Sequence, residues 1–351
     1  MISDLRRLVG SLFHVGIPGP ELDAALRATL ADLQVGGVIL FRRNVESREQ
    51  LLRLTAAIHA LPSRPLVSID HEGGRVMRLG EPFTHFPPAA VVGHSGDPAM
   101  AEQVGSAMAA ELASAGIDLC FAPVLDVHSN PANPVIGDRS FGSDPHVVAA
   151  FGVALMRGLL AGGVLCCGKH FPGHGDTATD SHFELPVVHK TRAELDQIEL
   201  VPFRAAIAAG LPMVMSAHVV YPALDREQPS TLSRLILGDL LRRELGFAGV
   251  VASDDLDMRA NTNHQPPGAA AIASLKAGVD LLLVCQNFDN ATAAIAGVEA
   301  AVASGELALQ RVEEAAGRIA RLRNQPRPRP QACELPNLGH RALAERLRRL
   351  A

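Results

Sequence analysis

The chain of 351 residues has no tryptophan, a single tyrosine (Tyr221) and only 4% aromatic residues. Proteins that slide along a polysaccharide usually bind it in a long cleft paved with aromatic rings, which stack on the faces of the sugars. The shortage of such rings argues against that class of protein. If the ligand is a sugar, we expect a small pocket that recognises one unit through hydrogen bonds.

Several kinds of segment are also missing. The net charge of −5 is modest and there is no long basic run, which argues against nucleic acid and anionic membrane surfaces as partners. No window approaches the roughly 18 apolar residues that span a bilayer, and residues 1–19 lack the apolar stretch of a signal peptide. We therefore expect a cytoplasmic protein, monomeric, that binds neither nucleic acid nor membranes.

Two residue types are scarce enough to be informative. There are five cysteines, an odd number, and four of them lie in apolar, strand-like runs, so we expect buried free thiols and no disulfides or metal site. There are only three lysines, Lys169, Lys190 and Lys276, among many arginines. A lysine in such a chain is notable, because arginine could serve wherever any cation would do.

Short apolar runs rich in β-branched residues recur along the chain, separated by stretches of helical character. These runs are residues 35–41, 65–70, 118–123, 164–168, 212–217, 249–253 and 279–284. Their nearly continuous hydrophobicity is typical of parallel strands buried on both faces. The alternation predicts either a closed (β/α)8 barrel or an open doubly wound sheet. No G-x-G-x-x-G turn follows a strand, which favours a single α/β barrel of the TIM type. Only seven runs are visible, so we expect a hidden eighth strand or an imperfect barrel.

Helix-boundary signals support this alternation. Thr191 and Glu194 form a capping-box pattern, Gly210 is a stop signal, and Pro202 is expected to divide this segment into two helices. Another helix is predicted to begin at Ser233.

The end of the chain has a different character. Residues 325–338 are rich in proline and arginine and have no apolar period. We expect residues 1–324 to form the catalytic barrel. Residues 325–351 are expected to be a surface arm with a short helix and not a separate domain.

Polar residues follow five consecutive predicted strands. They lie in residues 70–75 (DHEGGR), 137–142 (GDRSFG), 169–175 (KHFPGHG), 216–218 (SAH) and 253–255 (SDD). In a (β/α)8 barrel, catalytic groups lie where strands end and the following loops begin. One such aspartate is often structural, but five polar strand ends in a row predict a polar pocket at one rim.

The segment of residues 172–182 has few large apolar side chains, and we expect an exposed, mobile loop there. Asp180 and His182 lie two residues apart, close enough for a carboxylate to orient an imidazole, as an acid/base pair requires. The alternative is a solvated loop with ordinary turn residues.

Several of these segments resemble the signature of family 3 glycoside hydrolases, in particular the bacterial N-acetyl-β-glucosaminidases of peptidoglycan recycling. The resemblance lies in residues 169–177 (KHFPGHGDT), 180–182 (DSH), 70–75, 138–142 (DRSFG), 218–225 and 253–256 (SDDL), with Met258. The matches follow the family's order and span about residues 35–284. The resemblance implies an exo-acting, retaining β-N-acetylhexosaminidase. This enzyme would remove terminal non-reducing N-acetylglucosamine from muropeptide-type substrates without a metal or cofactor.

The resemblance also implies roles for individual residues. Asp254 would be the nucleophile and His182 the general acid/base, with Asp180 as its partner. The hydroxyls and N-acetyl group of the terminal sugar would be bound by Asp70, Arg78, Arg139, Lys169 and His170. A retaining glycosidase needs a carboxylate nucleophile and a second group that protonates the leaving oxygen. Many members of the family take that acid from a C-terminal domain, which we do not expect here, so the loop bearing His182 is the candidate source.

Two positions depart from or complicate the pattern. His71 stands where close relatives are expected to have glutamine, and the adjacent Asp255 competes with Asp254 for the role of nucleophile. We favour Asp254 because it directly follows Ser253 at the strand end.

Other functions stay open. A metal-dependent amidohydrolase could use His170, His174, His182 and His218 as ligands, although no His-x-His follows an early strand. A non-catalytic sugar-binding barrel is a second alternative. A glycoside phosphorylase is a third, because a neutral imidazole does not repel phosphate.

Overall fold

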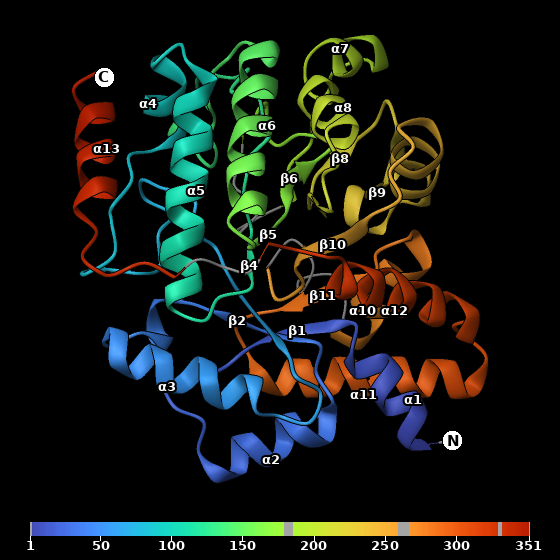
Figure 1. Cartoon of the computed structure of the whole chain (residues 1–351). Coiled ribbons are helices and arrows are strands. Elements are labelled where there is room, and N and C mark those ends of the chain that lie inside the picture. Colours follow the sequence, from blue (N-terminus) through green and yellow to red (C-terminus); the bar gives the residue numbers. More distant parts are fainter. Residues whose placement is uncertain (1, 179–184, 259–266, 329–331, 351) are drawn as a thin grey trace.

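The computed structural model describes residues 2–178, 185–258, 267–328 and 332–350. Its centre is a barrel of parallel strands surrounded by helices (Figure 1). The barrel strands are β1 (Phe13–Gly16), β2 (Gly37–Leu40), β3 (Leu66–Ile69), β4 (Leu119–Cys120), β5 (Leu165–Cys166), β6 (Gly168–Phe171), β7 (Met213–Ser216), β10 (Val250–Asp255) and β11 (Leu281–Val284).

The ring of strands is closed. The hydrogen-bonded order is β5-β4-β3-β2-β1-β11-β10-β7-β6. Its two ends, β5 and β6, are separated in the chain by Cys167 alone. The amide of Cys167 donates to the carbonyl oxygen of Ala122, so the chain stays bonded toward β4 as it passes from β5 to β6. These two segments are therefore parts of one strand, and the barrel has the eight strands of the (β/α)8 fold.

Strand β1 is the one that the sequence did not reveal. It lies between β11 and β2, with Phe13 opposite Leu282 and His14 opposite Gly37. Its four residues include a histidine and a glycine, so its apolar run is too short to stand out. With β1 included the predicted (β/α)8 fold is confirmed, and each of the seven predicted runs overlaps a barrel strand.

Helices cover the outside of the barrel and connect consecutive strands (Figure 1). They are α1 (Ile2–Gly10), α2 (Ala24–Leu33), α3 (Arg48–His59), α4 (Ala89–His94), α5 (Pro98–Ser114), α6 (Pro145–Ala161), α7 (Arg192–Gln197), α8 (Leu200–Ala208), η4 (Leu235–Glu244, of π type), α10 (Pro267–Ala277), α11 (Phe288–Ser304), α12 (Leu309–Asn324) and α13 (Leu338–Arg348). Short 3-10 turns are η1 (Arg42–Asn44), η2 (Gly137–Arg139) and η3 (Ser230–Leu232). In the part of the chain that the structure describes, no helix has the length and hydropathy needed to cross a membrane.

The predicted break in the helix after Thr191 is confirmed. The side chains of Thr191 and Glu194 form a capping box at the start of α7, and the chain then breaks before α8 begins at Leu200. Pro202 lies in the first turn of α8, where its missing N–H costs nothing. After β7, the strands β8 (Val220–Tyr221) and β9 (Asp225–Pro229) form a separate antiparallel pair.

The C-terminal arm ends in helix α13, which packs against α4 and α5 (Figure 1). Nδ1 of His340 on this helix lies 2.8 Å from Oε1 of Glu111 on α5. Oε1 and Oε2 of Glu111 also accept hydrogen bonds from the hydroxyl and amide of Thr84. Helix α13 is therefore joined through Glu111 to the loop after β3. The division of the chain into a barrel of residues 1–324 and an arm of residues 325–351 stays a prediction.

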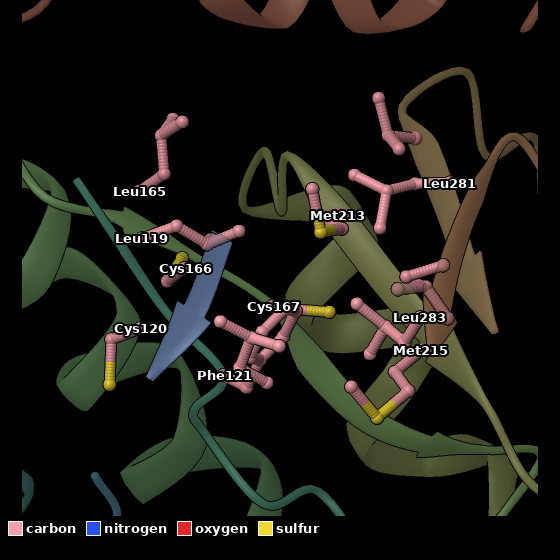
Figure 2. Packing of buried hydrophobic residues seen from close by; sticks show 14 of the residues in the cluster. Leu119, Cys120, Phe121, Leu165, Cys166, Cys167, Met213, Met215, Leu281 and Leu283 are labelled. Carbon is pink, nitrogen blue, oxygen red and sulfur yellow. The ribbon is translucent and has the colours of Figure 1, made fainter. Parts of the chain in front are cut away.

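Buried apolar and sulfur-bearing side chains pack on the barrel strands. Figure 2 shows Cys120, Cys166 and Cys167 with Phe121, Met213, Met215 and four leucines of neighbouring strands. Four of the five cysteines are buried free thiols, as predicted, and Cys333 is a half-buried free thiol. Such a filled interior gives the carboxyl ends of the strands a rigid base.

Candidate active site

A cavity of about 560 Å³ opens at the carboxyl ends of the barrel strands. This volume is typical of a small-molecule site. The core residues Phe121, Met215 and Leu283 form an apolar part of its wall. Its ionisable lining is Asp70, Glu72, Arg75, Arg78, Arg139, Lys169, His170, His174, Asp254, Asp255, Asp257 and Cys285. The predicted site residues Asp70, Arg78, Arg139, Lys169, His170 and Asp254 are thus brought together in one cavity.

Cations and carboxylates alternate along one wall of the cavity. Nζ of Lys169, in β6, lies 2.8 Å from Oδ1 of Asp70 and 2.6 Å from Oε1 of Glu72, both on the loop after β3. Arg139 donates to both carboxylate oxygens of Glu72, at 2.8 and 2.9 Å. Arg78 reaches Asp70 at 3.5 Å and lies over the ring of Phe41, 5.5 Å from its centroid. These contacts hold the charged side chains in fixed orientations at the cavity.

This network is buried yet charged. Burial alone would raise the pKa of Glu72, but the charges of Arg139 and Lys169 outweigh it and hold that pKa well below its usual range. Burial alone would lower the pKa of Lys169, and the carboxylates of Asp70 and Glu72 raise it instead. A compact array of fixed charges in a partly dry cavity is suited to binding several hydroxyl groups at once.

The two histidines of the cavity are held by Asp126, on the loop after β4. Oδ2 of Asp126 lies 2.7 Å from Nδ1 of His170, and Oδ1 accepts the backbone N–H groups of His170 and His174 at 3.1 and 2.7 Å. Nδ1 of His174 lies 2.9 Å from Oγ1 of Thr177. Burial, with the His170 ring nearby, lowers the pKa of His174 to about 4, so this ring is neutral at physiological pH.

Sequence reasoning missed Asp126 and gave Glu72 no role. A signal for Asp126 existed, because it is the one charged residue in the apolar run of residues 124–127. A charged residue in such a run is buried only when it is paired.

Asp254 and Asp255 end strand β10 in different environments. Asp254 is half-buried at the cavity, and its Oδ1 accepts the backbone N–H of Asp255 at 2.8 Å. Asp255 is 8% exposed, and its Oδ1 accepts the N–H groups of Cys285 and Asp257, each at 3.0 Å. Burial, with added repulsion from Asp257 and Asp254, raises the pKa of Asp255 to about 7. Asp255 therefore joins β10 to the end of β11, and Asp254 is the more exposed of the two carboxylates at the cavity.

The expectation of an exposed loop at residues 172–182 was wrong for its first part. Residues 172–175 and Thr177 are buried, Asp176 is half-buried, and Ala178 is exposed. A Cβ at Gly175 would collide with the carbonyl oxygen of Val127, and the side chain of Asn133 donates to the carbonyl oxygen of His174. Glycine is needed here because the backbone packs closely against Val127. In a sequence, such a run of small residues has the same composition as an exposed loop, which is why the prediction was wrong.

Two predicted catalytic residues, Asp180 and His182, lie outside the described residues. His218, a proposed ligand under the amidohydrolase alternative, does not line the cavity. Its Nε2 lies 3.0 Å from the carbonyl oxygen of Asp255, and its Nδ1 lies 2.9 Å from Oγ1 of Thr231. Within the described ranges no three His, Cys, Asp or Glu side chains are grouped so that they could hold a metal ion.

Comparisons with known proteins agree with this architecture. A model of the glycosyl hydrolase family 3 N-terminal domain matches residues 5–322. A β-hexosaminidase of Chromobacterium violaceum is 46% identical over 291 residues, which are 81% of each chain. A β-hexosaminidase of Nitrosospira multiformis is 43% identical over 319 residues, 89% of this chain and 88% of the relative.

A solved structure of a related protein has the same fold as this chain. NagZ from Neisseria gonorrhoeae, in complex with N-trifluoroacetyl-D-glucosamine, superposes with a TM-score of 0.82 at 37% identity. The superposition covers 97% of this chain and 98% of that one.

A closed (β/α)8 barrel with a cavity of alternating carboxylates and cations at its carboxyl rim fits the glycoside hydrolases that use this fold. The family match extends over most of the chain, and the chain belongs to glycosyl hydrolase family 3. Its enzymatic activity is that of a β-N-acetylhexosaminidase. The metal-dependent amidohydrolase and the non-catalytic binding protein are set aside.

Proposed function

We propose that this β-N-acetylhexosaminidase removes terminal non-reducing N-acetylglucosamine through a glycosyl-enzyme intermediate on Asp254. The observation that carries the proposal is the contrast between the two carboxylates of β10. Asp254 is half-buried and lines the cavity, whereas Asp255 is only 8% exposed and both of its oxygens accept hydrogen bonds from the residues that follow β11. A carboxylate with a pKa of about 7 is also partly protonated at neutral pH, which makes Asp255 the poorer nucleophile.

The charged wall supports recognition of a single terminal sugar. Strands β3 and β10 stand on opposite sides of the barrel, four places apart in its ring. A sugar with its anomeric carbon at Asp254 would therefore present its hydroxyls to Asp70, Arg78 and Lys169. Donors and acceptors held in ion pairs bind vicinal hydroxyls without reorganising, which favours an exo-acting enzyme with a one-sugar subsite.

The general acid/base is assigned to His182 with Asp180 as its partner, on the strength of the family signature. Of the two described histidines at the cavity, His174 has a pKa of about 4, too low for a protonated acid at neutral pH.

The natural substrate follows from the family branch. We propose a muropeptide, N-acetylglucosamine linked to a muramic acid peptide, in the cytoplasmic recycling of peptidoglycan by a monomeric enzyme. The cavity of about 560 Å³ has room for the terminal sugar and part of the next unit. Release of sugar from an N-acetylglucosaminide but not from the matching plain glucoside would support specificity for a terminal N-acetylglucosamine. Equal rates on the two substrates would contradict it.

The decisive experiment is to trap the intermediate. A slow 2-fluoro analogue of the substrate should leave a covalent adduct, which digestion and mass spectrometry should place on Asp254. An adduct on Asp255 or Asp70 would overturn the assignment. In the same assay, added phosphate tests the phosphorylase alternative, because a phosphorylase would release the sugar 1-phosphate in place of the free sugar.

A further inference from the structure

A polar cluster outside the cavity joins the two ends of one chain segment. Nζ of Lys190 lies 3.6 Å from Oδ1 of Asp176 and 2.9 Å from Oγ of Ser129, and it pairs with Oε1 of Glu199. Asp176 precedes and Lys190 follows residues 177–189, the segment that contains the proposed acid/base. The cluster therefore holds together Asp176 and Lys190, the residues on either side of this segment.

The cluster is buried, so its geometry is restricted. The side chains of Glu199, Lys190 and Asp176 are 0%, 15% and 26% exposed. Burial raises the pKa of Glu199, and the Lys190 ammonium opposes this shift. Without the ammonium, Glu199 would be a buried carboxylate that has lost its cation, a change that is strongly destabilising in other proteins.

The chain before Asp176 is held against the same cluster. The hydroxyl of Tyr221, the only tyrosine of the sequence, donates to the carbonyl oxygen of Gly173. A Cβ at Gly173 would meet Cγ of Glu199 at 2.7 Å. The side chain of Asn130 donates to the backbone carbonyl oxygen of Asp176 at 3.3 Å. A shift of Lys190 or Glu199 would therefore move the base of the segment.

We propose that Lys190 is a positioning residue for acid/base catalysis. It fixes the two described ends of the segment that contains the proposed acid, through Asp176, Ser129 and Glu199. The ammonium donates to Oγ of Ser129 and Oε1 of Glu199 and forms an ion pair with Asp176. The inference rests on the proposed role of His182.

The test compares Lys190→Met with the wild-type enzyme on two N-acetyl-β-glucosaminides, one with an activated aryl leaving group and one with a sugar leaving group. The value of kcat/KM reports on the glycosylation step for both. An activated phenolate leaves without a proton, so its rate should fall less than about threefold, whereas the sugar substrate should lose about 10–100-fold. Equal losses on both substrates, or no loss on either in a folded variant, would overturn the proposal.

Controls separate this role from a general loss of stability. Lys276→Met removes a lysine that pairs with Glu306 at 2.9 Å on the surface, and it should change neither rate. If Lys190→Met does not fold, Ser129→Ala and Asp176→Asn take its place, with the same selective loss expected. His182→Ala is measured in parallel. If it shows no selective loss, the proposed function fails and this inference with it. If His182→Ala shows the selective loss and the variants of Lys190, Ser129 and Asp176 do not, only this inference fails.

Discussion

Nζ of Lys169 lies 2.6 Å from Oε1 of Glu72 although the two side chains are only 3% and 4% exposed. Glu72 also accepts two hydrogen bonds from Arg139, so one buried carboxylate is shared by two cations. The geometry of Lys169 and Arg139 at the cavity thus depends on a residue that is itself almost inaccessible to solvent.

Glu72→Gln should therefore destabilise the protein and weaken substrate binding. The change leaves two buried cations without their shared anion, and loss of one partner from a buried ion pair typically costs about 3–5 kcal/mol. Urea unfolding should show this loss, and KM should rise more than kcat falls. Glu306→Gln, which breaks the exposed pair with Lys276, should cost less than about 1 kcal/mol. A similar small cost for Glu72→Gln would contradict the proposed role of Glu72.

Asp254→Asn and Asp255→Asn should differ in activity and in chemical rescue. The first variant loses the proposed nucleophile, so kcat should fall by about 10⁴-fold or more. Azide should restore part of the rate by forming a glycosyl azide of inverted configuration. Asp255→Asn disturbs the contacts with Cys285 and Gln286 but spares the nucleophile. We expect a loss of roughly tenfold from misplacement, without azide rescue. Rescue of Asp255→Asn alone would reverse the assignment.

Three buried imidazoles should make the fold sensitive to acid. Burial lowers the pKa of His14 to about 3 and the pKa of His71 and His174 to about 4, each from 6.5. The unfolded chain binds protons at these rings below pH 6.5 and the folded chain does not, so stability present above pH 6.5 is lost as pH falls. At pH 5 each ring should cost about 2 kcal/mol.

Denaturant titrations at pH 5 and 7.5 measure this loss. His71→Gln, which removes one of the three titrating rings, should reduce the difference between the two pH values by about 2 kcal/mol. The opposite contribution of His59, whose pKa is raised by its hydrogen bond to Asp118, should be small because this pair is partly exposed. An unchanged difference in His71→Gln would show that the ring titrates normally in the folded protein.

Gly175→Ala should impair activity through packing alone. Its Cβ would collide with the carbonyl oxygen of Val127 and push residues 174–177 away from the loop after β4. A displacement of about 1 Å near a catalytic group can cost about 10²-fold in rate. At Gly19 a Cβ would meet no atom within 4 Å, so Gly19→Ala is the matched control and should keep full activity. Assays of kcat/KM with thermal unfolding distinguish displacement from global loss of structure.

The sequence predicted most barrel strands because strands buried on both faces are almost continuously apolar. It predicted part of the cavity lining because strand ends share one rim, although His218, just after β7, does not line the cavity. It did not predict β1, whose signal is too short, or the burial of residues 172–175, where small residues serve close packing. Asp126 was missed because its partners, His170 and His174, lie more than 40 residues away in the chain.

The amino-acid pattern by itself therefore determined the (β/α)8 architecture, the family signature and the set of groups that meet at the rim. These properties depend on local periodicity and on short motifs, which are written in consecutive residues. Only the tertiary structure decided how the charges are shared. Glu72 joins Arg139 to Lys169, Asp255 is buried with a raised pKa, and Lys190 lies between Asp176 and Glu199. Burial and pairing across the fold set these states, because desolvation and Coulomb energies depend on distances in space rather than along the chain.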